Sequence, residues 1–185
     1  NVFEERCQDF LANYQMIMNR VAKAAVLSGR KPEDIHVLAA TKTVPAELIA
    51  FATEHGISLI GENKAQELNE KYPFYQLPSQ NIHFIGHLQT NKVKDIIDKV
   101  EMIQSVDSLK LAKEISKQAQ KHGICMDILL EVNIGGEESK WGFKPEETEN
   151  AVLEISKLGG VHICGLMTIP PICENPEENR KYFKQ

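Results

Sequence analysis

The chain has 185 residues, 42% of them hydrophobic, which is enough to bury a sizeable core, and we expect a single domain over residues 1–185. Its 26 acidic and 21 basic residues give a formal charge of -5, which argues against nucleic-acid and anionic membrane partners, because phosphates attract basic surfaces. No apolar run approaches the length of a transmembrane helix.

The cysteines show neither a disulfide framework nor a metal-binding pattern. Cys7, Cys125, Cys164 and Cys173 form no C-x-x-C pair and are spread over expected helix, loop and strand segments. The N-terminus carries no signal-peptide pattern. We therefore expect reduced thiols in a cytoplasmic protein, and no metal site.

The first expected element is a long amphipathic helix, and a buried strand follows it. The residues that define the helix recur at steps of four and three before Gly29: Phe3, Cys7, Phe10, Tyr14, Ile17, Val21 and Ala24. The apolar run from Val37 to Ala40 then predicts a strand buried on both faces. Pro45 follows it and opens a helix over residues 46–55.

Lys42 stands where this strand gives way to the helix. In a parallel α/β fold the carboxyl edge of the strands is where ligands bind, and partial desolvation there lowers the pKa of a lysine toward a free amine that attacks carbonyls. Position alone also fits a solvated lysine whose ammonium group reaches water. The rest of the chain has to decide between these two interpretations.

Five more strands are expected, at residues 58–60, 82–85, 102–106, 126–134 and 161–167, with helices between them. The helix after the fourth strand begins at Ser108, a favoured N-cap residue. A strand followed by a helix is therefore the repeating unit of the chain.

Polar residues near the ends of these strands are further candidates for a site. Asn63, with Gln66 three residues on, resembles a capping box, and its amide is alternatively available to a ligand. Gly86 permits close backbone approach. His83 and His87 are more typical of hydrogen-bonded structural histidines than of catalysts.

The fifth strand has a polar and an apolar face. Glu131 and Asn133 lie on the face opposite Leu130, Val132 and Ile134, an arrangement that suits the interior of a barrel near its open end. A carboxylate buried there needs a partner.

Six strand-then-helix units indicate a parallel α/β fold, which is either an open doubly wound sheet or a barrel. No G-x-G-x-x-G follows the first strand, which disfavours a dinucleotide-binding fold. We expect a (β/α)8 TIM-type barrel preceded by a long N-terminal helix. Because six strands do not close such a barrel, we expect this chain to lack the last two βα units.

Several segments carry a family resemblance, in the same order and over nearly the whole chain. They are Gly29-Arg30-x-Pro32-Glu33, Leu38-Ala39-Ala40-Thr41-Lys42-Thr43-x-Pro45, Gly61-Glu62-Asn63, His83-Phe84-Ile85-Gly86-x-Leu88-Gln89-x-Asn91-Lys92, Lys140-x-Gly142 and Gly165-Leu166-Met167. With them the chain resembles the pyridoxal phosphate homeostasis protein family, which is similar in fold to the N-terminal barrel of alanine racemase.

The resemblance implies that Lys42 carries pyridoxal 5′-phosphate (PLP) as an internal Schiff base, and that Asn63, His83 and Met167 line the ring pocket. The serine-rich and Arg-x-Gly-Thr segments that bind the cofactor phosphate in family members are absent from these residues. Their loss removes charge-assisted hydrogen bonds to the phosphate, so we expect a large part of the cofactor affinity to be lost with them.

The expected function is therefore cofactor handling: the protein holds PLP on Lys42 and buffers it or delivers it to apo PLP-dependent enzymes, with no robust catalysis of its own. The alternatives are a PLP-dependent amino-acid racemase, a cofactor-free Schiff-base aldolase that uses the same lysine, and an interaction module with a solvated Lys42. The charge and the short loops suggest a monomer or weak dimer.

Overall fold

The computed structural model describes residues 1–75, 77–78 and 81–185. Its strands form one six-stranded sheet in the order β1-β2-β3-β4-β5-β6, and every neighbouring pair is parallel. The strands are β1 (Ala39–Ala40), β2 (Ile60–Glu62), β3 (Ile82–Phe84), β4 (Met102–Val106), β5 (Met126–Glu131) and β6 (Val161–Met167).

The connections between strands are helical. The α-helices are α1 (Val2–Leu27), α2 (Ala46–Glu54), α3 (Ala65–Lys71), α4 (Val93–Ile96), α5 (Leu109–Lys121), α6 (Pro145–Ile155) and α7 (Arg180–Phe183). Short 3-10 turns are η1 (Pro32–Asp34), η2 (Tyr72–Phe74), η4 (Thr90–Lys92) and η5 (Pro176–Asn179). No helix in the described ranges is both long and apolar enough to cross a membrane.

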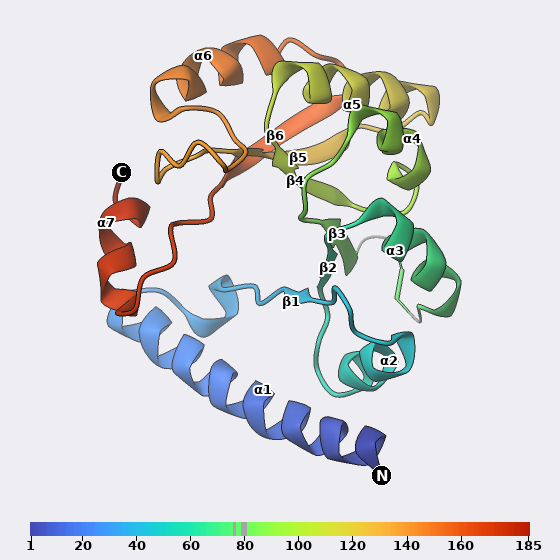
Figure 1. Cartoon of the computed structure of the whole chain (residues 1–185), viewed down its shortest axis with the longest axis vertical. Helices are drawn as coiled ribbons and strands as arrows, with labels where there is room; N and C mark the ends of the chain where they lie inside the picture. The colour runs from blue at the N-terminus through green and yellow to red at the C-terminus, as the bar shows by residue number, and fades with distance from the viewer. Residues whose placement is uncertain (76, 79–80) are drawn as a thin grey trace.

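The order of the strands decides between the two architectures. A doubly wound sheet reverses its strand order at a switch point and carries helices on both faces, whereas a barrel adds its strands in sequence order with helices on the outside. Here the order is sequential, and α2 to α6 lie outside a curved arc of strands (Figure 1). The expected barrel architecture, with six βα units and a long N-terminal helix, is confirmed.

The agreement between the expected and the observed strands varies along the chain. The strands at 102–106 and 161–167 have the expected bounds, whereas the first strand shrinks to Ala39–Ala40. The fifth ends at Glu131, and Val132 after it forms an isolated bridge with Phe143 of the following loop.

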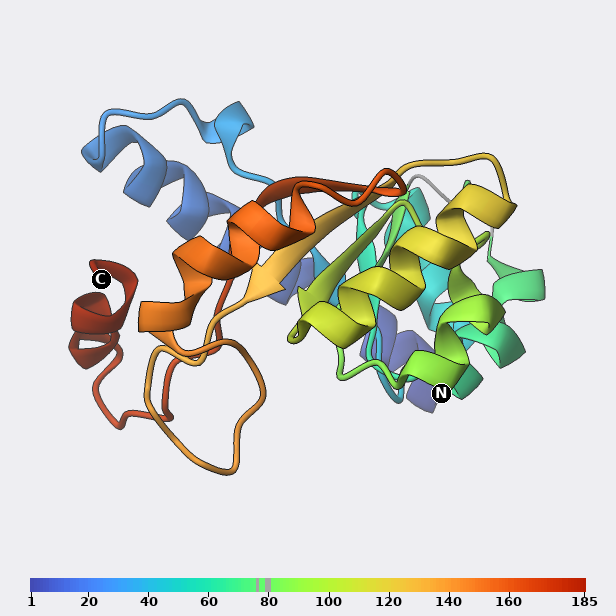
Figure 2. The same ribbon diagram turned by 90° about the horizontal axis from the view of Figure 1, so that it is seen from above.

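The hydrophobic core fills the layer between the outer face of the sheet and helices α3 to α6. Figure 2 shows α5 and α6 running over the strands from outside. In β5, Met126, Ile128 and Leu130 are buried against these helices, while the alternating Asp127 and Glu131 are only half-buried on the inner face. The expected polar face of the fifth strand is therefore the concave face of the sheet.

The N-terminal helix follows its expected stripe only halfway. Phe10 stacks on Tyr14, and the Tyr14 hydroxyl donates a hydrogen bond to the Gly56 carbonyl, so the first half packs on α2. Ile17 and Ala24 are exposed, and Ala25 is buried instead. The stripe shifts because a straight α-helix has 3.6 residues per turn, whereas a strict seven-residue repeat corresponds to about 3.5 residues per turn.

The start of β6 depends on a close approach to α5. The Gly160 amide donates a hydrogen bond to the Ser116 hydroxyl (2.9 Å), and a Cβ atom at Gly160 would lie 2.2 Å from the Ser116 carbonyl oxygen. A side chain there forces β6 and α5 apart. We expect Gly160→Ala to lower the free energy of unfolding by about 1–3 kcal/mol in urea denaturation.

Gly165→Ala is the control within the same strand, because its nearest non-neighbouring atom lies 3.6 Å from the new Cβ. Equal losses of stability in the two variants would contradict this account of the strand's position.

Candidate functional site

Lys42 lies in a tight turn at the carboxyl end of β1. The Val44 amide donates a hydrogen bond to the Thr41 carbonyl (3.1 Å), and Thr43 has a φ of 61°, as in a type II turn. Glycine is the usual residue at this position because a β-branched side chain is strained there. The Lys42 side chain is exposed, so the described residues do not supply the desolvation expected from its strand-end position.

A buried carboxyl group anchors this turn. Glu62 of β2 is fully buried, and one of its oxygens accepts hydrogen bonds from the Thr41 hydroxyl (2.7 Å), the Tyr75 hydroxyl (2.6 Å) and the Lys71 ammonium (3.2 Å). Burial, reinforced by Glu62, raises the pKa of Tyr75, so its hydroxyl stays a donor. Glu62 thus ties β1, β2 and the end of α3 together.

The helix α3 holds the same turn from a second side. Lys71 also donates to the Thr41 carbonyl (2.8 Å), and Glu67 accepts both from Lys71 and from the strained Thr43 amide (2.6 Å). Backbone strain of this kind persists only where the surroundings over-determine the conformation. The turn that carries Lys42 is therefore held in place by contacts from both β2 and α3.

The inner face of the sheet beside this turn is apolar. A Cβ atom at Gly61 would lie within 2.9 Å of the Leu38 and Ile85 side chains, so both cover the glycine on one face. The alternation of β1 places Lys42 on the same face as Leu38 and Ala40, and Ala40 is the register partner of Gly61. A small flat apolar surface thus adjoins the lysine.

Asn63 follows β2 at the level that Lys42 occupies after β1. The capping-box expectation was wrong: Lys64 is the N-cap of α3, and the Asn63 side-chain oxygen is buried without a hydrogen-bond partner among the described residues. The backbone of Asn63 also lies close to Gly86, since a Cβ atom there would lie 2.1 Å from the Asn63 carbonyl oxygen. The close approach expected at Gly86 is confirmed.

His83 lies in β3, two residues deeper than the level of Lys42, and is almost buried. Its Nδ1 accepts from the Gln104 amide (2.8 Å), and its Nε2 is 3.8 Å from a Glu101 carboxylate oxygen. Burial lowers the pKa of His83, and Glu101 opposes that shift. These contacts agree with the expected structural histidine.

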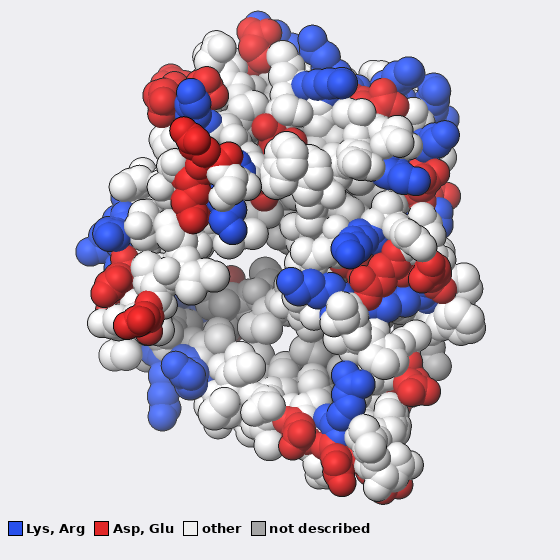
Figure 3. Space-filling model, in the orientation of Figure 1, with Lys and Arg blue, Asp and Glu red and all other residues white. Residues whose placement is uncertain are grey.

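Met167 ends β6, the edge strand opposite β1, where it pairs with Glu131. It lines a pocket of about 340 Å³ together with Val132 and with Phe183 of α7. The structure therefore brings Lys42 and Asn63 to adjacent strand ends, sets His83 one strand further and deeper, and places Met167 at the end of the opposite edge strand. Figure 3 shows that this face of the molecule is hollowed.

Sequence reasoning missed a second polar cluster at the same edge. His87 pairs with Asp107 (3.0 Å) and stacks on Trp141 (ring centroids 3.8 Å apart), and together they line a pocket of about 500 Å³. Burial raises the pKa of Glu131, and Asp107 adds to the shift while His87 opposes it. Only the polar alternation of the fifth strand hinted at this cluster.

The comparisons with known proteins agree with this geometry. Residues 8–185 match the family model described as alanine racemase, N-terminal domain, so the chain is a barrel domain of that class. The pyridoxal phosphate homeostasis protein of Aquifex aeolicus is 44% identical over 169 residues, which cover 91% of this chain and 74% of the relative. The chain belongs to the pyridoxal phosphate homeostasis protein family.

Solved structures give the same result. An unknown protein from Bifidobacterium adolescentis superposes with a TM-score of 0.88 at 33% identity, covering 97% of this chain and 76% of that one. PipY of Synechococcus elongatus with PLP bound superposes with a TM-score of 0.70 at 28% identity, covering 88% of this chain and 76% of that one.

The Glu62 cluster can be tested through stability. In Glu62→Gln the amide keeps one acceptor oxygen but brings an NH2 group to the buried position where the second carboxyl oxygen has no partner among the described residues. We expect the free energy of unfolding in urea to fall by about 1–3 kcal/mol. Glu70→Gln, on the exposed side of α3, is the control and should change the free energy of unfolding by less than about 0.5 kcal/mol. An equal change in both variants would contradict the anchoring role of Glu62.

The raised pKa of Glu131 predicts a pH effect. A carboxyl whose pKa is higher in the folded than in the unfolded chain favours folding while it is protonated, and this contribution is lost as pH rises through the folded-state pKa. Glu131→Gln should therefore raise Tm at pH 8 and leave it unchanged well below the ordinary glutamate pKa. The exposed Glu138→Gln should show no such crossover, and a Tm gain for Glu131→Gln that persists in acid would contradict the assignment.

Proposed function

We propose that the chain binds PLP on the inner face of the barrel, at the carboxyl ends of β1 to β3, attached through Lys42, and holds it for buffering or delivery. The observation that carries the proposal is the anchored turn of residues 41–44, which fixes an accessible primary amine at the strand ends of a PLP homeostasis family member. PipY, a structural neighbour, has been solved with PLP bound.

The residues present fit such a group. When bound, PLP supplies an aldehyde to which a primary amine adds with loss of water. The apolar surface made by Leu38, Gly61 and Ile85 suits one face of a flat aromatic ring. The buried oxygen of Asn63 has no protein partner among the described residues and is an acceptor for a ligand hydroxyl or ring substituent.

His83 and Met167 complete this proposal in a lesser role. His83 lies on the same face of the sheet, two residues below the level of the lysine, and would flank the deeper side of a bound ring. Met167 approaches from the opposite strand and supplies a polarisable apolar contact. Neither side chain carries the attachment itself.

The partners, the location and the oligomeric state that we propose follow from the same role. A protein that holds a reactive aldehyde passes it to apo PLP-dependent enzymes in the cytoplasm, as a monomer or weak dimer. Lysines and acidic residues are intermixed on the face in Figure 3 and do not gather into a basic stripe, which supports a small-molecule ligand over nucleic acid.

The test is the visible absorbance of the protein after addition of PLP and desalting. The parent should retain a band that borohydride bleaches, with the label on the Lys42 peptide, and Lys42→Ala should lose it. Lys64→Ala removes an exposed lysine one residue after Asn63 and is the matched control, which should retain the band.

Labelling that survives in Lys42→Ala, or that is lost equally in Lys64→Ala, would contradict attachment at Lys42. The same samples should be assayed for amino-acid racemisation. Turnover well above that of free PLP would replace the handling role by the racemase alternative.

A further inference from the structure

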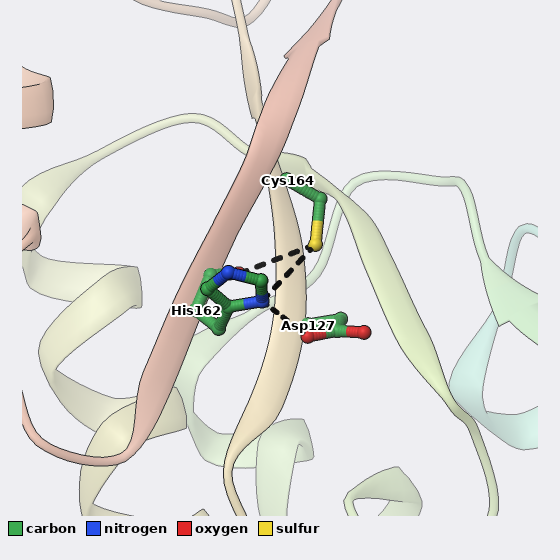
Figure 4. A group of neighbouring side chains, drawn as sticks. All are labelled: Asp127, His162 and Cys164. Carbon is green, nitrogen blue, oxygen red and sulfur yellow. Dashed lines mark hydrogen bonds and ion pairs between the residues drawn. The ribbon is translucent and has the colours of Figure 1, made fainter.

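Three side chains that belong to no part of the Lys42 site meet on the inner face of β5 and β6. Asp127, His162 and Cys164 each present one donor atom, and all three atoms lie within 4.8 Å of one another. The His162 Nδ1 is 2.9 Å from an Asp127 carboxylate oxygen and 3.5 Å from the Cys164 sulfur. Figure 4 shows the three groups pointing toward one another across the two strands.

The backbone explains why they converge. Asp127 and His162 are register partners on neighbouring strands, so their side chains lie side by side. The register then shifts: Ile128 pairs with Ile163 and Leu129 with Gly165, which leaves Cys164 as the extra residue of a β-bulge. Bulges re-aim side chains, and here the bulge turns the thiol back toward the His162 ring.

The geometry does not suit a catalytic relay. A nucleophile–histidine–carboxylate relay needs the two partners on different ring nitrogens, one accepting a proton and the other held by the acid. In this cluster both the carboxylate and the thiol face the same nitrogen, Nδ1. Three donor atoms aimed at one point are instead the arrangement of metal ligands.

We propose that Asp127, His162 and Cys164 form a binding site for a zinc ion. Carboxylate oxygen, imidazole nitrogen and thiolate sulfur are the donors that zinc takes, and three protein ligands leave a fourth tetrahedral position for water. One carboxylate and one thiolate balance the two positive charges of the ion. The proposal departs from the expectation of no metal site, which rested on spacing along the chain alone.

Binding has a defined proton balance. A free cysteine thiol is largely protonated at neutral pH, so the metal-free site carries that proton. Zinc forms the zinc–sulfur bond as that proton leaves to the solvent. No oxidant or reductant takes part.

The site lies nearer the amino ends of the strands than Lys42, and its Asp127 is within electrostatic reach of His83. Asp127 and His162 are the second residues of their strands, near the amino ends, whereas Lys42 follows the carboxyl end of β1. The proposal therefore goes beyond the proposed function and does not depend on it. Lys42→Ala should abolish PLP attachment and leave metal binding unchanged.

The experiment titrates the full chain, freed of metal with a chelator and kept reduced, first with Co²⁺ and then with Zn²⁺ as a competitor. The parent should bind one Co²⁺ with the absorption of tetrahedral cobalt and a thiolate-to-cobalt charge-transfer band, and Zn²⁺ should displace it. Cys164→Ser should lose the charge-transfer band, and His162→Ala should weaken binding by more than about 100-fold, the upper range for loss of supporting contacts alone.

Cys125→Ser is the matched control, because Cys125 is also exposed and lies two residues before Asp127 but offers no donor to the cluster. It should bind cobalt as the parent does. His162 and Cys164 are exposed, so we expect their variants to fold as the parent does, and circular dichroism checks this.

A measurement on the unmodified chain adds a second readout. Zinc should slow alkylation of Cys164 and leave that of Cys125 unchanged, as read from the labelled peptides by mass spectrometry. Absence of a cobalt band in the parent, equal loss in Cys125→Ser, or equal protection of both thiols would overturn the zinc site.

Discussion

The buried carboxyl group of Glu62 is the contact on which the site depends. It lies between the sheet and α3, where an unpaired carboxylate is costly, and one of its oxygens accepts from the Thr41 hydroxyl just after β1, from a phenol and from an ammonium group. Those donors are the neighbours of the Lys42 turn. The energy of pairing one buried charge therefore also holds a strained turn in place.

The two faces of the curved sheet carry different kinds of side chain. Its outer face meets α3 to α6 and is filled by aliphatic side chains, whereas its inner face carries the polar groups of alternate positions, such as Asp127 and Glu131. Along that inner face the carboxyl ends hold the lysine and Asn63, and the region near the amino ends holds the histidine and cysteine of β6. The inner face of one sheet thus carries two different sets of potential binding groups.

Local patterns predicted the regular elements well. The bounds of β4 and β6 and the Ser108 cap, whose hydroxyl accepts from the Leu111 amide (3.1 Å), follow from apolar runs and capping chemistry that need no distant partner. The expectation failed at Asn63, where the same chemistry suggested a cap. There the backbone packs against Gly86, more than twenty residues away, and Lys64 is the N-cap instead.

The sequence by itself determined the repeating units, the parallel barrel class, the lysine at the end of the first strand and the family. Each of these follows from short local segments whose residues lie close together in the chain. Only the tertiary structure decided that Glu62 anchors the Lys42 turn and that Asp127 meets His162 and Cys164. The physical reason is that these contacts depend on strand register and on a bulge between segments about 20 to 35 residues apart, which no local pattern encodes.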